Sequence, residues 1–378
     1  MKNVSAPANF AIIGHTGFSQ VNFRGPLIED IVARGHRVFA LAPDFDAPTR
    51  AAVRALGAEP VEYSLSRTGL NPGRDFVDSF KLFRTLDRLN VDCVLSYAIK
   101  PVIYGTLAAS LARVPRRHAL VPGLGYAFTE GEDVSLKRRV VGLSARRFYR
   151  LALARADCVF MQNPDDAHDF VSMGIVDQDK IITVDGTGIR LDEWAPTPPV
   201  SSPVTFLLVA RMLRDKGVFE FVEAARAVRE VHPQARFILA GDTDANPEAI
   251  SRLQLTAWAE SGIVEWPGQV AVKEWLAQAS VFVLPSYREG VPRSTQEAMA
   301  MGRPIITTDA PGCRETVIAG ENGFLVPPRD AEALAAAMRR FITEPGLISS
   351  MGAKSRAYAE EKFDVRNINA VMIRAMGL

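Results

Sequence analysis

Two kinds of hydrophobic pattern alternate along the first half of the chain. Short runs rich in β-branched and aromatic residues are separated by stretches such as Gly73–Leu89 and Ile103–Arg113, in which apolar residues recur every three or four positions. The short runs predict buried strands, and the longer periodic stretches predict amphipathic helices. The predicted strands are Phe10–Gly14, Arg37–Pro43, Pro60–Ser64, Asp92–Tyr97, Arg117–Gly123, Cys158–Asn163 and Lys180–Val184. This alternation favours a parallel sheet with helices on both faces.

A proline-rich segment, Glu193–Val204, interrupts the pattern and is typical of an interdomain linker. A second set of strands follows it, again separated by helical stretches: Thr205–Ala210, Arg236–Gly241, Val264–Gly268, Val281–Ser286, Pro304–Asp309 and Gly323–Pro328. The sequence therefore predicts an α/β protein with two Rossmann-like, doubly wound parallel-sheet domains that face a cleft. We expect an N-terminal domain over 1–195, a C-terminal domain over 203–354, and a terminal helix over 355–378 that can pack on either domain, including back onto the first.

Composition narrows the range of functions. The 378 residues are 48% apolar, enough for two cores, and the 44 basic and 43 acidic residues nearly balance. A balanced charge gives no global field that would favour nucleic acid. Three cysteines, Cys93, Cys158 and Cys313, lie in or beside apolar segments without metal-binding spacing, which predicts buried, reduced thiols. No signal peptide or membrane-spanning run is evident, so we expect a cytoplasmic protein.

Two strand ends in the second half carry candidate chemistry. Ligands of open parallel sheets bind beyond the carboxyl ends of the strands. The run RMLRDKG after one strand places Arg211 at the strand end and Lys216 at the mouth of the next helix. Two cations beside helix-start amides suit a diphosphate, although basic residues in a solvated loop would look the same.

The second strand end leads into a helix whose start is flanked by Glu289 and Glu297. Gly290 permits a close approach of the backbone, and Pro292 suits the first helical turn. The amides from Val291 onward then point toward an anion, while a carboxylate further inside the helix can accept bonds from vicinal hydroxyls. Coincidence remains the alternative for two glutamates considered without their surroundings.

Taken together, these motifs resemble glycosyltransferase family 4, a retaining family with the two-domain GT-B architecture. The resemblance rests on VARMLRDKG, LAGD, PSYREGVPRSTQEAMAMGRPIITTDAPGCRETV and NGFLVPP, which follow in order through the C-terminal half. It implies that Glu289 contacts the transferred sugar and Glu297 binds the ribose. It also implies that Arg211 and Lys216 clamp the diphosphate and stabilise the charge that develops on the leaving group. The other expected donor-binding residues are Gly290, Val291, Pro292, Arg293, Ser294, Gly241, Asp242, Gly14 and Gly17.

The N-terminal half resembles the subgroup that adds sugars to polyprenyl-diphosphate-linked acceptors in bacterial glycan and capsule assembly. The resemblance is carried by SYAIKPVIYG and VPGLGYAF, both at predicted strand ends. It implies acceptor-binding roles for Lys100, Gly123, Gly125 and Tyr126. The histidine that many members place in this domain is not evident, since His118 enters its strand too early and is as well explained as a core residue.

A basic segment, Ser135–Arg155, has apolar residues near helical spacing and carries no acid. Such a helix can lie on anionic lipid or pack its apolar stripe on the sheet, and the two arrangements are compatible. We expect peripheral attachment to the cytoplasmic leaflet through Lys137, Arg138, Arg139, Arg146, Arg147 and Arg150.

The resemblance favours a UDP-sugar donor, UDP-N-acetylhexosamine or UDP-hexose, and front-face attack at the anomeric carbon. The patterns at Asp44–Asp46 and Asp242–Asp244 mimic a metal-binding DxD, but no metal requirement is expected, because Arg211 and Lys216 supply positive charge and Asp242 is expected to line the base pocket. Two other functions share the architecture: a UDP-sugar 2-epimerase, and a catalytically silent subunit that binds sugar nucleotide.

Overall fold

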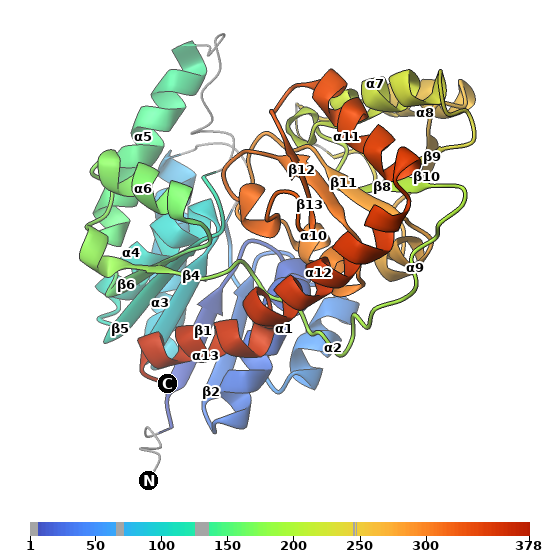
Figure 1. The fold of residues 1–378 in the computed structure, drawn as a ribbon. Helices are drawn as coiled ribbons and strands as arrows, with labels where there is room; N and C mark the ends of the chain where they lie inside the picture. The colour runs from blue at the N-terminus through green and yellow to red at the C-terminus, as the bar shows by residue number, and fades with distance from the viewer. Residues whose placement is uncertain (1–6, 66–71, 125–135, 245, 247) are drawn as a thin grey trace. The chain divides into compact units, whose positions relative to one another are not determined.

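The computed structural model describes residues 7–65, 72–124, 136–244, 246 and 248–378. The chain divides into two compact units (Figure 1). Unit 1 comprises Met1–Thr187 with Arg366–Leu378, and unit 2 comprises Gly188–Val365. Each unit contains one parallel sheet, which confirms the predicted class of two Rossmann-like domains.

The sheet of unit 1 has seven strands in the order β3-β2-β1-β4-β5-β6-β7. Its strands are β1 (Asn9–Ile13), β2 (Arg37–Ala42), β3 (Glu59–Glu62), β4 (Cys93–Tyr97), β5 (Arg116–Val121), β6 (Cys158–Met161) and β7 (Ile181–Thr183). Its helices are α1 (Gly17–Ala33), α2 (Ala47–Ala55), α3 (Pro72–Arg88), the π-helix η1 (Pro101–Gly105), α4 (Thr106–Leu111), α5 (Leu136–Leu153), α6 (Pro164–Ser172), the short η3 (Gln178–Lys180) and α13 (Val365–Met376). The helix predicted from Ile103 thus begins as one π-helical turn.

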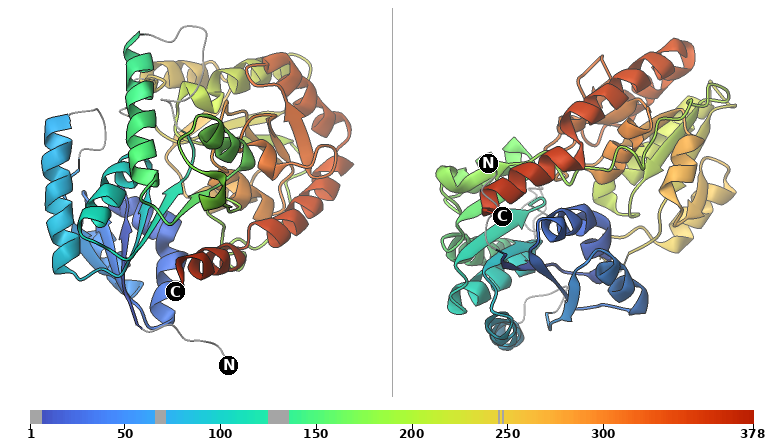
Figure 2. Two further views of the ribbon diagram at one scale, coloured as in Figure 1. Left: turned by 90° about the vertical axis from the view of Figure 1, so that its left-hand side faces the viewer. Right: turned by 90° about the horizontal axis from the view of Figure 1, so that it is seen from below.

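Alternation along the strands of unit 1 decides which helices cover each face. In β1, Phe10 and Ile12 join the core beneath α1 and α13, whereas Ala11 and Ile13 join the core beneath α3 and α4. Both faces of the sheet are therefore buried, which explains why the strands read as nearly continuous apolar runs. Figure 2 shows α13 beside α1, where the Asn369 side-chain amide donates to Asp30 at 2.7 Å.

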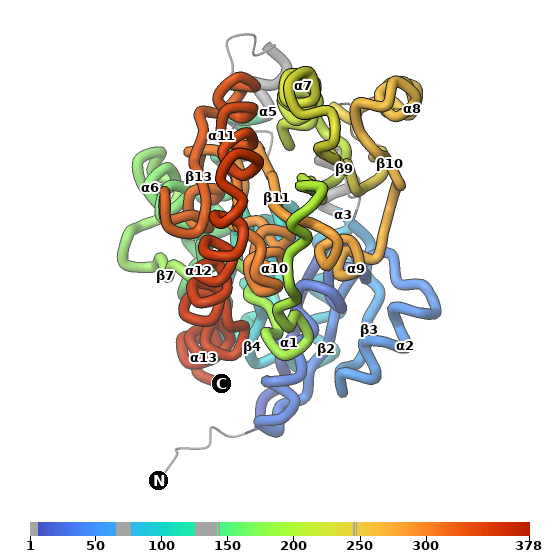
Figure 3. The backbone as a smooth tube through the Cα atoms, turned by 45° about the vertical axis from the view of Figure 1, so that its right-hand side comes forward, coloured from blue at the N-terminus to red at the C-terminus, as the bar shows by residue number. Residues whose placement is uncertain are grey.

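Unit 2 repeats the construction with six strands in the order β10-β9-β8-β11-β12-β13. Figure 3 traces the backbone of this unit and labels β9, β10, β11 and β13. Its strands are β8 (Thr205–Val209), β9 (Arg236–Ala240), β10 (Glu265–Gly268), β11 (Val281–Leu284), β12 (Ile305–Thr308) and β13 (Gly323–Val326). Its helices are the short η4 (Arg214–Lys216) and η5 (Arg314–Thr316), together with α7 (Val218–Arg229), α8 (Arg252–Glu260), α9 (Val272–Ala277), α10 (Arg293–Ala300), α11 (Ala331–Thr343) and α12 (Gly346–Lys362). Chain order reverses between β8 and β11, which is where open sheets bind ligands.

The division into units differs from the predicted boundaries at 195, 203 and 354, because the proline-rich segment is bound to unit 2. Arg303 is fully buried and donates to Leu276 O at 2.8 Å and to Thr197 O at 2.7 Å. Burial lowers the pKa of Arg303 to about 10, and carbonyls at the carboxyl ends of α9 and α10 surround its guanidinium. The segment predicted as an interdomain linker is therefore part of the second unit. The terminal region forms two helices, of which α12 belongs to unit 2 and α13 packs on unit 1.

Candidate active site

The carboxyl edge of the unit 2 sheet brings together charged residues from the ends of β8, β9 and β11; we call this region the unit 2 edge. At its centre the Lys216 ammonium donates to Glu289 Oε1 at 2.5 Å. The Ser286 hydroxyl donates to the same oxygen at 2.8 Å. Burial alone would lower the pKa of Lys216, but the carboxylates of Glu289 and Asp215 raise it above its ordinary value. Lys216 therefore keeps its positive charge in a largely buried position.

Arg211 lies at the same edge with a different partner. Its side chain is 56% exposed, and its guanidinium is 3.0 Å from the Asp244 carboxylate. Asp242 accepts from Arg252 at 2.8 Å and from its neighbour's amide. Both carboxylates of the DTD pattern are thus engaged by arginines. Among the described residues, no cluster of three or more His, Cys, Asp or Glu could hold a metal ion.

The helix α10 starts at this edge without a side-chain cap within the described part of the chain. Pro292 is the N-cap residue, so its side chain offers no acceptor to the first amides. Glu297 is 8% exposed and accepts from Arg293 Nε at 2.8 Å. Burial raises the pKa of Glu297, and Arg293 opposes that rise. An uncapped helix start at the same sheet edge as Lys216 and Arg211 offers amides, next to a source of positive charge, to an anion.

Two glycines of the unit 2 edge are required by close backbone approach. A Cβ on Gly241 would lie 1.8 Å from Ala210 O, and one on Gly312 would lie 2.1 Å from Gly290 O. Both residues have positive φ, which strains any other residue. The indole of Trp266 donates to Gly241 O at 2.8 Å. These contacts hold the segments that carry Asp242 and Glu289 in fixed positions.

In unit 1, the predicted glycine loop after β1 is closed by internal packing. A Cβ on Gly14 would lie 2.3 Å from the Tyr97 hydroxyl oxygen, and one on Gly17 would lie 2.7 Å from the ring of Phe45. Tyr63 donates to Gly14 O at 2.8 Å. The glycines therefore have a packing reason within the unit that is separate from any ligand. The DFD carboxylates also have local partners, since Asp44 accepts from the Gly17 amide and Asp46 caps α2.

The predicted acceptor residues follow β4 and β5. Lys100 immediately precedes the π-helix η1, and Ala98 before it has φ of 72°, a left-handed conformation that is strained for alanine. π-Helical turns are frequent at functional sites. Gly123 has φ of 148° and follows β5, whereas Gly125 and Tyr126 lie outside the described residues.

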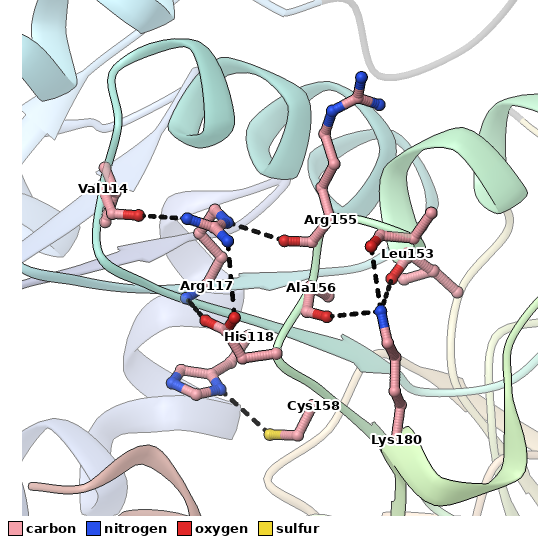
Figure 4. A network of polar contacts seen from close by, with 10 residues as sticks. Val114, Arg117, His118, Leu153, Arg155, Ala156, Cys158 and Lys180 are labelled. Atoms are coloured by element: carbon pink, nitrogen blue, oxygen red, sulfur yellow. Dashed lines mark hydrogen bonds and ion pairs between the residues drawn. The ribbon is translucent and has the colours of Figure 1, made fainter.

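His118 lies in the middle of β5, where Figure 4 shows its ring beside Cys158. The distance between His118 Nδ1 and Cys158 Sγ is 3.0 Å, and both side chains are buried. Burial lowers the pKa of His118 to about 4 and raises that of Cys158 to about 12, so both groups are neutral near pH 7. All three cysteines are buried and free, as predicted.

The basic segment forms α5, which is anchored at its carboxyl end. Lys180 donates to Ala154 O at 3.0 Å and to Ala156 O at 3.1 Å, and Arg117 donates to Arg155 O at 2.7 Å (Figure 4). Three of the predicted membrane residues, Arg146, Arg147 and Arg150, are exposed along this helix. The side chains of Lys137, Arg138 and Arg139 lie outside the described part. In the regions that the structure describes, no helix is long and apolar enough to cross a bilayer.

Some contributors to the site were not predicted from the sequence. Ser286, Asp244 and Arg252 each engage a predicted residue or its neighbour. A serine three residues before a glutamate is a weak signal, and the pairing of Asp244 with Arg211 joins loops after different strands. Only the Ser286 contact is local enough to be found by inspecting the motif.

Both halves of the chain are similar to known glycosyltransferases. Residues 24–185 match the profile described as Glycosyl transferase 4-like domain, and residues 203–344 match Glycosyl transferases group 1. A protein of Campylobacter jejuni named N,N'-diacetylbacillosaminyl-diphospho-undecaprenol alpha-1,3-N-acetylgalactosaminyltransferase is 32% identical over 337 residues, covering 85% of this chain and 86% of that protein. The putative glycosyltransferase EpsD of Bacillus subtilis is 26% identical over 282 residues, covering 70% of this chain and 71% of that protein. The chain therefore belongs to the group 1 glycosyltransferases, which confirms that its motifs identify a glycosyltransferase.

Solved structures share the fold. Anabaena HepE in complex with UDP has a TM-score of 0.75 at 17% identity, with 98% of this chain and 99% of that chain covered. Sucrose-phosphate synthase from Thermosynechococcus elongatus has a TM-score of 0.78 at 19% identity, with 97% and 98% covered. The predicted GT-B class is confirmed by these full-length similarities.

Proposed function

We propose that the protein transfers a sugar from a UDP-sugar, UDP-N-acetylhexosamine or UDP-hexose, to a saccharide linked to polyprenyl diphosphate. The observation that carries this proposal is the similarity to the Campylobacter transferase, whose name specifies an undecaprenyl-diphosphate-linked acceptor and which aligns along both units. A UDP donor is further supported by the HepE complex, which contains UDP.

The unit 2 edge supplies what a nucleotide-sugar donor requires. Lys216 and Arg211 provide positive charge for the diphosphate, and the first amides of α10 add donors to it. Glu297 is assigned to the ribose hydroxyls and Glu289 to the sugar. Fixed charges at this position stabilise the nucleoside diphosphate as it leaves, which lowers the barrier for transfer.

We assign a retaining, front-face reaction to this site. The bond from the anomeric carbon to the diphosphate oxygen breaks, and a bond from the acceptor hydroxyl oxygen forms on the same face. The hydroxyl proton passes to the departing phosphate oxygen, so no covalent enzyme intermediate is required. We propose that Lys216 and Arg211 supply the charge that a divalent ion supplies in other transferases.

A membrane-bound acceptor calls for a membrane-facing surface on unit 1, and we assign it to α5 and α3. On α5 the exposed arginines Arg146, Arg147 and Arg150 adjoin Leu151, which is 47% exposed. On α3, Val77 is 51% exposed and Phe80 is 49% exposed, one turn apart. Both helices pack beside α4 and η1, so these side chains belong to one layer of the unit. Basic residues beside exposed apolar ones favour the anionic cytoplasmic leaflet.

The membrane assignment is tested by flotation with vesicles that contain anionic lipid. Replacing Arg146, Arg147 and Arg150 with glutamine should lower the bound fraction, with a steeper loss at raised salt. A matched variant neutralises Arg34, Arg54 and Arg226, which are exposed elsewhere. Equal binding by both variants would refute the assignment.

The activity is tested by measuring nucleoside diphosphate release from UDP-, GDP- and ADP-sugars, with and without a polyprenyl-diphosphate-linked saccharide. We expect turnover of one UDP-sugar only when the lipid acceptor is present. Conversion of the donor without acceptor would instead favour the 2-epimerase. Binding without turnover under all conditions would favour a silent subunit, and use of a GDP- or ADP-sugar alone would overturn the donor assignment.

A further inference from the structure

We propose that Ser286 is a positioning residue for Glu289, acting through a buried brace formed by the end of β12 and the segment after it. This inference rests on the proposed contact between Glu289 and the transferred sugar. Ser286 itself is fully buried. It is therefore assigned no contact with the donor and acts through the carboxylate that it holds.

The first observation is that two donors converge on one carboxylate oxygen. Glu289 Oε1 accepts from the Ser286 hydroxyl at 2.8 Å and from the Lys216 ammonium at 2.5 Å. An ammonium is a compact charge with three rotatable donors, so it fixes the position of a partner more than its direction. A hydroxyl on a short, buried side chain adds a second, directional constraint. Together they select one orientation for the long side chain of Glu289.

The second observation is that the backbone carbonyl of Ser286 is fixed by two hydrogen bonds. Its carbonyl oxygen accepts from the hydroxyl of Thr308, the last residue of β12, and from the Cys313 thiol at 3.7 Å. Thr308 and Cys313 are fully buried. Both donors reach the backbone of Ser286 and not its hydroxyl, which leaves the hydroxyl directed to Glu289.

The third observation is that the same segment fixes the backbone of Glu289. The Glu289 amide donates to Pro311 O at 3.0 Å, and Gly312 approaches so closely that a Cβ there would lie 2.3 Å from Glu289 O. The turn from Ser286 to Glu289 is thus held at its first residue, at its last residue and at the carboxylate. A group held in this way needs little reorganisation when a ligand arrives.

The test separates binding of the sugar from binding of the nucleotide. Affinities for UDP and for the UDP-sugar that turns over in the donor panel are measured by calorimetry for Ser286→Ala, Ser286→Thr and Glu289→Gln. We expect Ser286→Ala to weaken UDP-sugar binding roughly 3- to 10-fold, the value of one hydrogen bond, while UDP binding changes less than twofold. Ser286→Thr keeps the hydroxyl and should restore most of the loss.

A matched control removes a neighbouring buried hydroxyl that does not contact Glu289. Thr307 is fully buried and donates to Leu284 O at 2.7 Å, so Thr307→Val should lower Tm to a similar extent without changing the ratio of the two affinities. If Ser286→Ala weakens UDP and UDP-sugar binding equally, Ser286 is only structural and the inference is overturned.

The same measurements distinguish this inference from the proposed function. If Glu289→Gln causes no sugar-dependent loss, the assigned sugar contact fails, and the positioning role fails with it. If Glu289→Gln causes that loss and Ser286→Ala does not, the sugar contact stands and only the positioning role is rejected.

Discussion

The carboxyl edges of the two sheets have the same backbone architecture but carry different side chains. At the unit 2 edge, charged side chains meet in pairs, with Lys216 on Glu289 and Arg211 on Asp244. At the corresponding edge of unit 1, two tyrosine hydroxyls have neutral partners: Tyr97 is 2.8 Å from the Ser19 hydroxyl, and Tyr63 donates to the backbone carbonyl of Gly14. Burial raises the pKa of both tyrosines, so they remain neutral. The same architecture therefore supports one edge whose charged pairs suit a charged ligand and another whose glycine loop contacts neutral tyrosine hydroxyls.

The strongest way to break this comparison is to add one methyl group at each edge. Gly312→Ala would press a Cβ against two backbone carbonyls, whereas the nearest atoms to a Cβ on Gly14 all belong to the Tyr97 side chain. We expect roughly a 100-fold loss of kcat/KM for Gly312→Ala and a loss of roughly tenfold or less for Gly14→Ala.

The control for backbone strain is Gly35→Ala, where φ is 86° and no atom lies within 4 Å of the added Cβ. This variant should keep full activity with a small loss of Tm. Equal kinetic losses at Gly312 and Gly14 would show that the two edges are not braced differently.

A second test uses the neutral, buried histidine of unit 1. The pKa of His118 is about 4 in the folded chain and about 6.5 when unfolded, so the unfolded state binds the extra proton first as pH falls. Stability should therefore be complete above pH 6.5 and decline between pH 6.5 and 4, by about 3 kcal/mol from this residue.

The measurement is the midpoint of urea unfolding at pH 7 and at pH 4.5. It is made on the whole natural protein and on the His118→Gln variant. The pH-dependent difference should be smaller in the variant. An unchanged difference would mean that other groups account for the acid sensitivity.

The charge of the unit 2 edge is tested by Lys216→Ala. We expect transition-state stabilisation to fall by about 1.5 to 3 kcal/mol, the range for a charge-assisted hydrogen bond. Steady-state kinetics on the donor gives this value from kcat/KM. An unchanged kcat/KM would refute the assigned role of Lys216, whatever its effect on stability.

The smallest effect is expected at the exposed pair. Asp244→Asn removes the charge that faces Arg211, whose side chain is mostly exposed, so the free energy of unfolding should change by less than about 0.5 kcal/mol. Donor KM should fall or stay constant, because Asp244 no longer competes with the diphosphate for Arg211. A marked rise in KM would indicate that Asp244 holds Arg211 in its working position.

The order of strands and helices could be predicted because both sheets are buried on two faces. Runs such as Phe206–Leu208 are apolar without interruption, and the motif carrying Glu289 and Glu297 is continuous in sequence. The partners of those residues could not be predicted equally well. The Arg211–Asp244 pair joins loops after β8 and β9, and the brace behind Ser286 comes from β12, so each depends on how separate segments pack.

The proline-rich segment shows the same limit more clearly. Its composition is that of a linker, yet the fully buried Arg303 ties Thr197 to the ends of two helices. Nothing near Thr197 in the sequence indicates an arginine more than a hundred residues later as its partner. The composition predicted where the alternation of strands and helices is interrupted. Long-range hydrogen bonds determine the unit to which the segment belongs.

The chain passes from unit 1 to unit 2 after Thr187 and returns to unit 1 after Val365. These two points also determine where segments can be exchanged between related proteins. A chimera that receives a foreign donor unit should take Gly188–Val365 as one block, because Thr197 would otherwise leave its Arg303 partner behind. The last helix, α13, should stay with the recipient, since Asn369 is fitted to Asp30 at the other end of the sequence. A single crossover between Thr197 and Val204 would separate both pairs, so the part of this protein that can be exchanged is an internal block with two boundaries.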